Sequence, residues 1–151
     1  MANPEHLTLI KNGVEGLNAF ARANRDVPLD LEGADLRGID LREVTLINVR
    51  LAGANLEGAD LRGAHLPAAD LQRCNLRNAD LRGASLHRAN LSGTDVRGAR
   101  FESFGLGQQM CLSPVFFEGV HWDRETLEGI LGIINLNPDW EVRYQIVSRS
   151  A

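Results

Sequence analysis

The stretch that decides the fold of this chain is ADLRG-IDLRE-VTLIN-VRLAG-ANLEG-ADLRG, residues 34–63. Leucine returns at every fifth position, and the same register runs from residue 29 to residue 103 as fifteen tandem pentads. A small or apolar residue stands two positions before each leucine, and a short polar residue, most often Asp or Asn, stands between them. The leucine positions, which Val96 and Phe101 continue, are Leu31, Leu36, Leu41, Leu46, Leu51, Leu56, Leu61, Leu66, Leu71, Leu76, Leu81, Leu86 and Leu91.

A period of five fits neither common secondary structure, because a helix repeats about every 3.6 residues and a strand every 2. Within a pentad the small residue and the leucine are two positions apart, so both face one side of a short extended segment. The last two residues, often Arg-Gly or Glu-Gly, have to turn the chain, which glycine favours. The pattern therefore predicts an all-β solenoid in which stacking of small units buries a leucine ladder.

The pentads at residues 34–38, 54–58 and 79–83 all read Ala-(Asp/Asn)-Leu-x-x. This motif resembles that of the pentapeptide-repeat proteins, and the resemblance covers about half of the 151 residues. It implies a right-handed quadrilateral β-helix with one pentad on each face and four in each coil. Fifteen pentads would then form just under four coils.

The sequence predicts a single domain over residues 1–151, with an N-terminal helical cap (1–28), repeat coils (29–122) with a loop near 107–114, and a C-terminal helix-plus-strand cap (123–151). In the first cap, Asn3 is placed to begin a helix over residues 3–24, and a break is predicted near Asn12-Gly13. The residues expected to face inward there are Leu7, Ile10, Val14, Leu17, Phe20 and Ala21.

At the other end, residues 115–122 resume the repeat out of phase, with aromatic residues in the leucine slots. Asp123 is a good N-cap for a helix over residues 124–134, and residues 140–147 alternate as a strand does. Two roles stay open for that strand: it pairs with the last coil, or it contacts a second subunit in a homodimer. The candidate cap or dimer contacts are Phe116, Phe117, Trp122, Leu127, Ile130, Leu131, Ile134, Trp140 and Tyr144.

Composition excludes several functional classes. The net charge of −4 and the pI of about 5.5 give no general affinity for nucleic acid. No apolar run is long enough for a membrane span, and no signal segment is expected. Cys74 occupies a small-residue slot and Cys111 lies in another segment, so the two are predicted to be reduced thiols. These features are typical of a cytoplasmic bacterial protein.

The chemically reactive residues form no catalytic constellation. Asp recurs before the leucines as part of the repeat, where a short polar side chain bonds nearby backbone. The four histidines lack metal-ligand spacing, although His65 and His87 share one face in the four-per-coil arrangement. We expect no catalytic residue, no metal and no cofactor.

Two faces of the predicted solenoid differ in their outward residues. On one, the column of Asp40, Asp60 and Asp80 runs beside that of Arg42, Arg62 and Arg82, and it predicts a solvated surface in which like charges stack and repel. The face around Leu46, Leu66 and Leu86 has no acidic residue, and it carries Ile47, Pro67 and Ala68 as a small apolar patch. Scattered surface apolar residues explain that patch too. The candidate partner-contact residues are Ile47, His65, Pro67, His87 and Arg88.

These features predict a non-enzymatic protein-interaction or scaffold module with an unidentified protein partner. The alternative comes from the resemblance, because some family members imitate duplex DNA and protect DNA gyrase. That role needs a strongly anionic rod, but residues 29–103 contain eleven acidic residues against ten arginines. An enzyme would need a site built by residues 104–151, where the aromatic residues look more like capping core.

Overall fold

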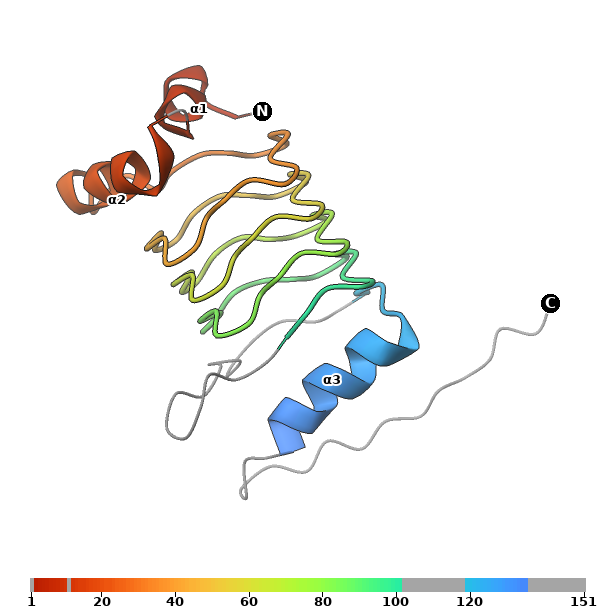
Figure 1. Ribbon diagram of the computed structural model, residues 1–151. Coiled ribbons are helices and arrows are strands. Elements are labelled where there is room, and N and C mark those ends of the chain that lie inside the picture. Colours follow the sequence, from red (N-terminus) through yellow and green to blue (C-terminus); the bar gives the residue numbers. More distant parts are fainter. Residues whose placement is uncertain (1, 11, 102–118, 136–151) are drawn as a thin grey trace.

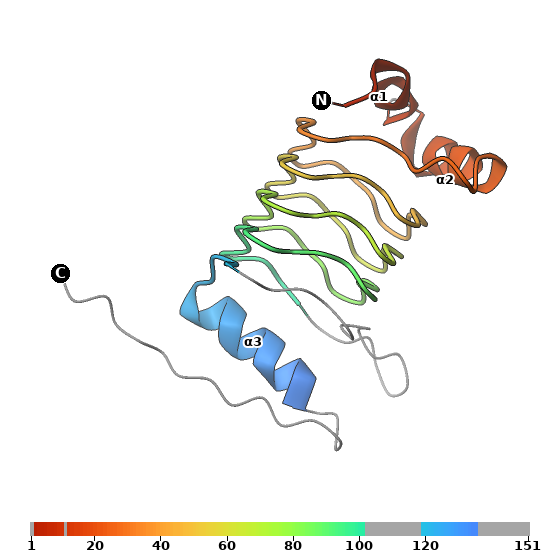
Figure 2. The same cartoon turned by 180° about the vertical axis from the view of Figure 1, so that it is seen from behind.

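The protein is a stack of coils with helices at both ends. The computed structural model describes residues 2–10, 12–101 and 119–135, with side chains up to residue 131. Helix α1 spans Pro4–Ile10, α2 spans Gly13–Ala23 and α3 spans Arg124–Asn135. The first two lie where the chain enters the stack, and α3 lies at the opposite end (Figures 1 and 2).

Parallel bridges between the coils fix the register. They join residues twenty apart, as in Asp40↔Asp60 and Asp60↔Asp80, so four pentads make one coil. We number the faces by their leucine positions. Face one holds Leu31, Leu51, Leu71 and Leu91; face two holds Leu36, Leu56, Leu76 and Val96; face three holds Leu41, Leu61, Leu81 and Phe101; face four holds Leu46, Leu66 and Leu86. The described residues contain only these single bridges and no longer strand.

Each face repeats the same backbone hydrogen bonds. The leucine N–H donates to the carbonyl of the polar slot in the next coil, as from Leu36 to Asn55 at 2.8 Å. The N–H of that polar residue donates back to the small residue of the coil before, from Asn55 to Ala34 at 2.9 Å. These bonds satisfy the backbone of each extended segment without longer strands.

A tight turn separates successive faces. The N–H of Ala34 donates to the carbonyl of Leu31 at 3.0 Å, and Gly33 between them has a φ of +70°. A positive φ at this third turn position favours glycine. On face four the equivalent corners are instead Asn48, Ala68 and Arg88, with φ values of +57°, +55° and +61°.

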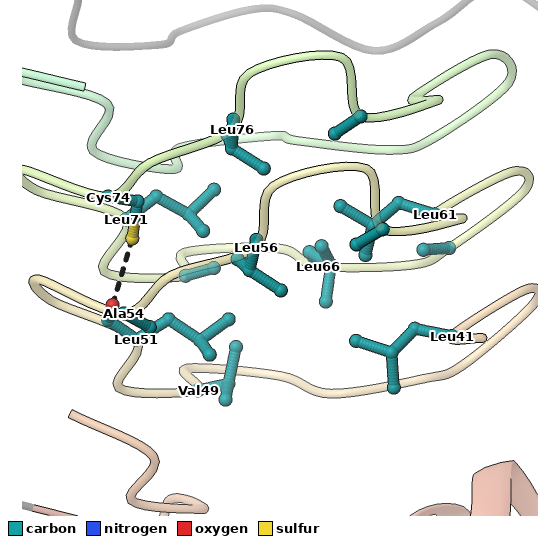
Figure 3. Packing of buried hydrophobic residues seen from close by; sticks show 14 of the residues in the cluster. Leu41, Val49, Leu51, Ala54, Leu56, Leu61, Leu66, Leu71, Cys74 and Leu76 are labelled. Atoms are coloured by element: carbon teal, nitrogen blue, oxygen red, sulfur yellow. Dashed lines mark hydrogen bonds between the residues drawn. The ribbon is translucent and has the colours of Figure 1, made fainter. Parts of the chain in front are cut away.

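The leucine ladder fills the interior (Figure 3). The leucines from Leu51 to Leu91 are at most 1% exposed, and burying each such side chain contributes about 1.5–3 kcal/mol. Cys74 and Thr94 occupy small-residue slots, and both donate to a carbonyl of the preceding coil. The Cys74 Sγ donates to Leu51 at 2.8 Å and the Thr94 hydroxyl to Leu71 at 2.7 Å. Both polar atoms are therefore satisfied inside the core.

The N-terminal helices have the predicted break, since α1 ends at Ile10 and α2 begins at Gly13. Asn3 acts as predicted, because its Oδ1 accepts from the Glu5 N–H at 2.9 Å. Leu17 belongs to the core. The expectation for Leu7 is wrong, because Leu7 is 37% exposed while its neighbour His6 is 7% exposed. His6 accepts a hydrogen bond from the Asp30 N–H at the solenoid edge, so His6 lies on the inward side of α1 in place of Leu7.

At the C-terminal end the repeat resumes out of phase, as the sequence predicts. His121 bridges Asp95, which is twenty-six residues earlier, and Trp122 packs against the core in the next leucine slot of face two. Asp123 is the predicted N-cap, since its Oδ1 accepts from the Thr126 N–H at 2.8 Å. Its other carboxylate oxygen accepts from the Gly98 N–H, which ties α3 to the last complete turn of face two.

In α3, Ile130 and Leu131 are buried as expected and Leu127 is half-buried. Thr126 is also buried, and its hydroxyl contacts the Ala99 carbonyl at 3.4 Å. The other candidate cap or dimer contacts lie outside the described side chains: Phe116, Phe117, Ile134, Trp140 and Tyr144. The predicted loop at 107–114 and strand at 140–147 lie there too. No described helix is both long and apolar enough to cross a bilayer.

Candidate functional site

Face three carries a ladder of paired charges. Each Arg pairs with the Asp two positions before it, as in Arg42 Nη2 to Asp40 Oδ2 at 2.6 Å. The same Arg approaches the next coil, with its Nε 3.7 Å from Asp60 Oδ2. The stacked arginines repel as predicted, since the charge of Arg42 acts to lower the pKa of Arg62, and the diagonal contacts with Asp offset part of this repulsion.

These pairs change the acidity of the carboxyl groups. Hydrogen bonds from the Arg42 side chain and then from its backbone N–H lower the pKa of Asp40 to about 2. Arg62 and Arg82 lower the pKa of Asp60 and of Asp80 in the same way, each against the effect of partial burial. At neutral pH these carboxylates are ionised and already bonded, so they are poorly suited to general acid or base work.

The polar slot has the structural role that the sequence indicates. The side-chain oxygen of its Asp or Asn accepts from the backbone N–H two residues later, as from Arg62 to Asp60 at 3.2 Å and from Ser92 to Asn90 at 3.0 Å. This contact stabilises the turn that follows.

Face four differs from face three in its outward residues. The parallel bridges stack Thr45, His65 and Ser85 in one column. Ile47, Pro67 and His87 form the next column. Its carbonyls accept hydrogen bonds from the coil on the N-terminal side, called the coil above, since the Pro67 oxygen accepts from Asn48 N–H at 3.0 Å. Ile47 is 58% exposed in that column, directly above Pro67.

The structure therefore places the predicted contact residues on one face. His65, His87 and Arg88 are exposed, while Pro67 is half-buried. His65 and His87 lie in different columns, because the bridge partner of His65 is Ser85. Acidic residues are absent from the outward positions of the three face-four pentads, 44–48, 64–68 and 84–88.

A cleft lies at the end of face four nearest the N-terminal helices, which we call the upper end. Residues 24–29, the entry segment, connect α2 to the first coil there. The cleft has a volume of about 350 Å³. Two of its walls carry the exposed apolar side chains Val27 (53% exposed) and Ile47 (58% exposed). Its complete lining is Asn18, Ala21, Arg22, Asn24, Arg25, Val27, Leu29, Thr45, Leu46 and Ile47.

Sequence reasoning did not predict the role of His6 and Asn18. Their side chains accept hydrogen bonds from backbone N–H groups at the upper edge of the stack. The Asp30 N–H donates to Nδ1 of His6 at 2.9 Å, and the Thr45 N–H donates to Oδ1 of Asn18 at 2.7 Å. In lower coils such N–H groups bond the coil before, which the first coil lacks. The His6 ring, which must be unprotonated at Nδ1 to accept, also packs edge-on against Phe20 with 4.9 Å between ring centres.

A signal for these two residues exists in the sequence, but it is weak. His6 lies four residues before Ile10 and so shares its helical face, which marks a polar residue on an inward stripe. Nothing in the sequence says which backbone N–H it meets, because that depends on how the helix docks.

The described residues offer no built metal or nucleophile site. They contain no group of three or more His, Cys, Asp or Glu side chains placed to hold a metal ion. Burial raises the pKa of the Cys74 thiol to about 12, so it stays protonated and unreactive. Cys74 is a free cysteine, as predicted.

Comparison with family models matches the pentapeptide-repeat model, in eight copies, to residues 30–63 and 64–102. The chain is a pentapeptide-repeat protein. Membership of this family implies the right-handed β-helix, and the twenty-residue register above shows its four-sided coil. A search of curated proteins found no significant match to this pentapeptide-repeat chain.

Several solved structures resemble it. A pentapeptide-repeat protein (Rfr23) from the cyanobacterium Cyanothece 51142 is 35% identical, over 60% of this chain and 54% of that one, with a TM-score of 0.44. A second, alr5209 from Nostoc, is 26% identical over 78% of this chain and 94% of that one, with a TM-score of 0.30. QnrB1, a plasmid-mediated fluoroquinolone resistance protein, is 23% identical over 62% and 59%, with a TM-score of 0.26. The pentapeptide-repeat chain thus spans little more than half the length of the first and third of these.

Proposed function

We propose that this pentapeptide-repeat protein is a non-enzymatic interaction module that binds a protein partner through face four. The observation that carries the proposal is the exposure of Ile47, at 58%, on a face without an acidic residue in its three pentads. Charged pairs and turn contacts occupy the outward groups of face three. An exposed aliphatic residue beside exposed polar ones, such as His65 and Arg88, is the kind of surface that a partner covers.

The interior argues against an enzyme. The leucine ladder leaves no room for a substrate inside the coils, since its central members are at most 1% exposed. Binding on a flat outer face needs no such cavity. A cytoplasmic location and a homodimer through the C-terminal segment remain predictions that accompany this proposal.

The alternative function, imitation of DNA toward gyrase, has no specific observation in its favour. Asp40, Asp60 and Asp80 are each paired with an arginine at 2.6 Å, so the surface they form is nearly neutral. A mimic of duplex DNA needs a dense row of uncompensated negative charge. We expect purified protein to leave gyrase supercoiling unchanged, with or without a fluoroquinolone.

A photocrosslinking experiment tests the proposal. A photoreactive amino acid is placed singly at Ile47, Pro67 or His87 in the full chain, in cells of the organism that encodes it. Matched positions on face two, Arg37 and Arg77, serve as controls because both are exposed. We expect a discrete protein adduct from face four and none from face two. Adducts of equal yield from both faces would overturn the assignment of face four.

A further inference from the structure

At the upper edge of face four, two backbone carbonyls lack the hydrogen-bond donors that the equivalent carbonyls have in lower coils. In the coil below, the carbonyl oxygen of His65 accepts from Leu46 N–H at 2.9 Å, so it points toward the N-terminal end of the stack; Pro67 does likewise. By the same register the carbonyls of Thr45 and Ile47 point that way too, into the cleft that these residues line. Neither accepts a hydrogen bond from the described part of the chain.

The entry segment would supply the missing donors if it continued the repeat. Twenty residues before Thr45 and Ile47 stand Arg25 and Val27, which line the opposite side of the cleft. In the regular ladder the donor to the Ile47 oxygen would be the N–H of residue 28, but Pro28 has no N–H. The segment therefore lies beside face four without bonding to its edge, and a cleft of about 350 Å³ remains.

The charged residues that line this cleft are both arginines, while Asp26, exposed between Arg25 and Val27, is outside the lining. Arg22 at the end of α2 and Arg25 in the entry segment are both exposed, and neither pairs with a carboxylate among the described residues. Farther along face four stands Arg88, also exposed. An anionic partner would be attracted here, whereas the arginines of face three are already paired.

We propose that the cleft binds an extended acidic segment of a partner protein by strand addition. The segment's backbone N–H groups donate to the Thr45 and Ile47 oxygens. Its aliphatic side chains pack between Val27 and Ile47, and its carboxylates pair with Arg22 and Arg25. This inference rests on the proposed function, because it names the kind of partner that face four receives.

Strand addition is favoured over a small ligand for a physical reason. The open carbonyls belong to Thr45 and to Ile47, which begins the turn, and in the coil that follows the equivalent carbonyls of His65 and Pro67 accept from the N–H groups of Leu46 and Asn48. Those donors are two residues apart, which is the spacing at which a strand presents its N–H groups to one edge. The volume of the cleft lies within the usual range for ligand pockets, about 300–1,000 Å³, so the two open carbonyls are the observation that favours a strand. A short peptide that continues outward along the edge uses the site without needing a deeper cavity.

Selection from a surface-displayed library of random nonapeptides against the full chain tests the proposal. We expect the enriched peptides to alternate acidic and aliphatic residues. Their binding should weaken about tenfold or more in the double variant Arg22→Gln/Arg25→Gln, because two desolvated ion pairs are lost. The control variant Arg73→Gln/Arg77→Gln removes the same charge from faces one and two, away from the cleft, and should bind as the wild type does.

Backbone substitution tests the strand itself. Methylating the amides of the best peptide one at a time should weaken binding at alternate positions only, because alternate N–H groups face the edge. Amide resonances of residues 45–48 should shift on binding. Failure to enrich peptides, enrichment without acidic residues, binding that is insensitive to the double variant, or a uniform effect of methylation would each overturn the proposal.

Two further outcomes separate this inference from the function on which it rests. If photocrosslinking from His87 persists in vivo while Arg22→Gln/Arg25→Gln changes nothing, face four binds a partner but the cleft does not, and the inference fails alone. If sedimentation shows a dimer that the double variant dissolves, the occupant is a second copy of this chain, which overturns a separate acidic partner.

Discussion

Faces three and four share one interior and have different exteriors. Leu61 on face three and Leu66 on face four are equally buried, each 1% exposed, and both belong to the same ladder. Outside, face three presents Asp60 bonded to Arg62 at 2.6 Å, while face four presents exposed His65 beside Pro67. The inward residues therefore determine the coil, and the outward residues are free to determine what the coil contacts. Four predictions test this division.

The largest effect is expected from a charge placed in the ladder. Leu61→Lys buries an ammonium group without a partner, which costs several kcal/mol, and we expect it to abolish folding. The matched variant Ile47→Lys places the same group on the exterior of face four and should fold normally. Circular dichroism and thermal melting distinguish them. A cooperative melt for Leu61→Lys near the wild-type temperature would contradict the ladder.

The second effect concerns the edge that the helices close. His6→Ala leaves the Asp30 N–H without its acceptor in a part-buried position, so we expect a loss of about 1–3 kcal/mol in the free energy of unfolding. Leu7→Ala should cost less, because Leu7 is partly exposed. Urea denaturation measures both. A larger loss for Leu7→Ala would restore the original apolar-stripe interpretation of α1.

Acid should lower the stability that the ion pairs of face three contribute to the fold. The carboxyl of Asp40 has a pKa of about 2 in the fold against 3.8 for an ordinary Asp, so its contribution is complete above about pH 4 and disappears as the pH falls through about 2. Asp60 and Asp80 are shifted in the same direction. We expect stability to fall across this window, measured by thermal melting at successive pH values.

Because these ion pairs are exposed, each contributes only a small free energy to stability. Asp60→Asn keeps the oxygen that accepts from the Arg62 backbone but loses the ion pair, and should cost only about 0.2–1 kcal/mol at neutral pH. It should also flatten the acid dependence. An unchanged acid profile in a variant that replaces Asp40, Asp60 and Asp80 together would show that other carboxyls cause it.

The smallest effect is expected at a corner of face four. Ala68 has a φ of +55°, where a side chain is strained, so Ala68→Gly should stabilise by up to about 1 kcal/mol after the entropy of glycine is counted. The corresponding corner of face three gives the control. Gly63→Ala should destabilise, because its φ is +65° and the added carbon would lie 3.3 Å from the Glu43 side chain. Equal effects of one sign would contradict the turn geometry.

The candidate site was partly accessible to sequence reasoning. The contact residues Ile47 and Pro67 follow from the five-residue register once twenty residues make a coil, because positions twenty apart stack. The cleft beside them does not follow, since it depends on where α2 docks and on how segment 24–29 enters. The diagonal contact of Arg42 with Asp60 also needed the structure, because its length depends on side-chain rotamers.

The sequence by itself determined the repeat, the leucine core, the broken N-terminal helix and the Asp123 cap, because each is a local pattern whose partners lie within a few residues or at a fixed period. Only the tertiary structure decided which face of α1 turns inward, which edge donors His6 and Asn18 satisfy, and where carbonyls stay open. These contacts join residues more than twenty positions apart with no period to relate them. Their geometry is determined when the helices pack on the first coil, so it cannot be predicted from the spacing of residues in the sequence.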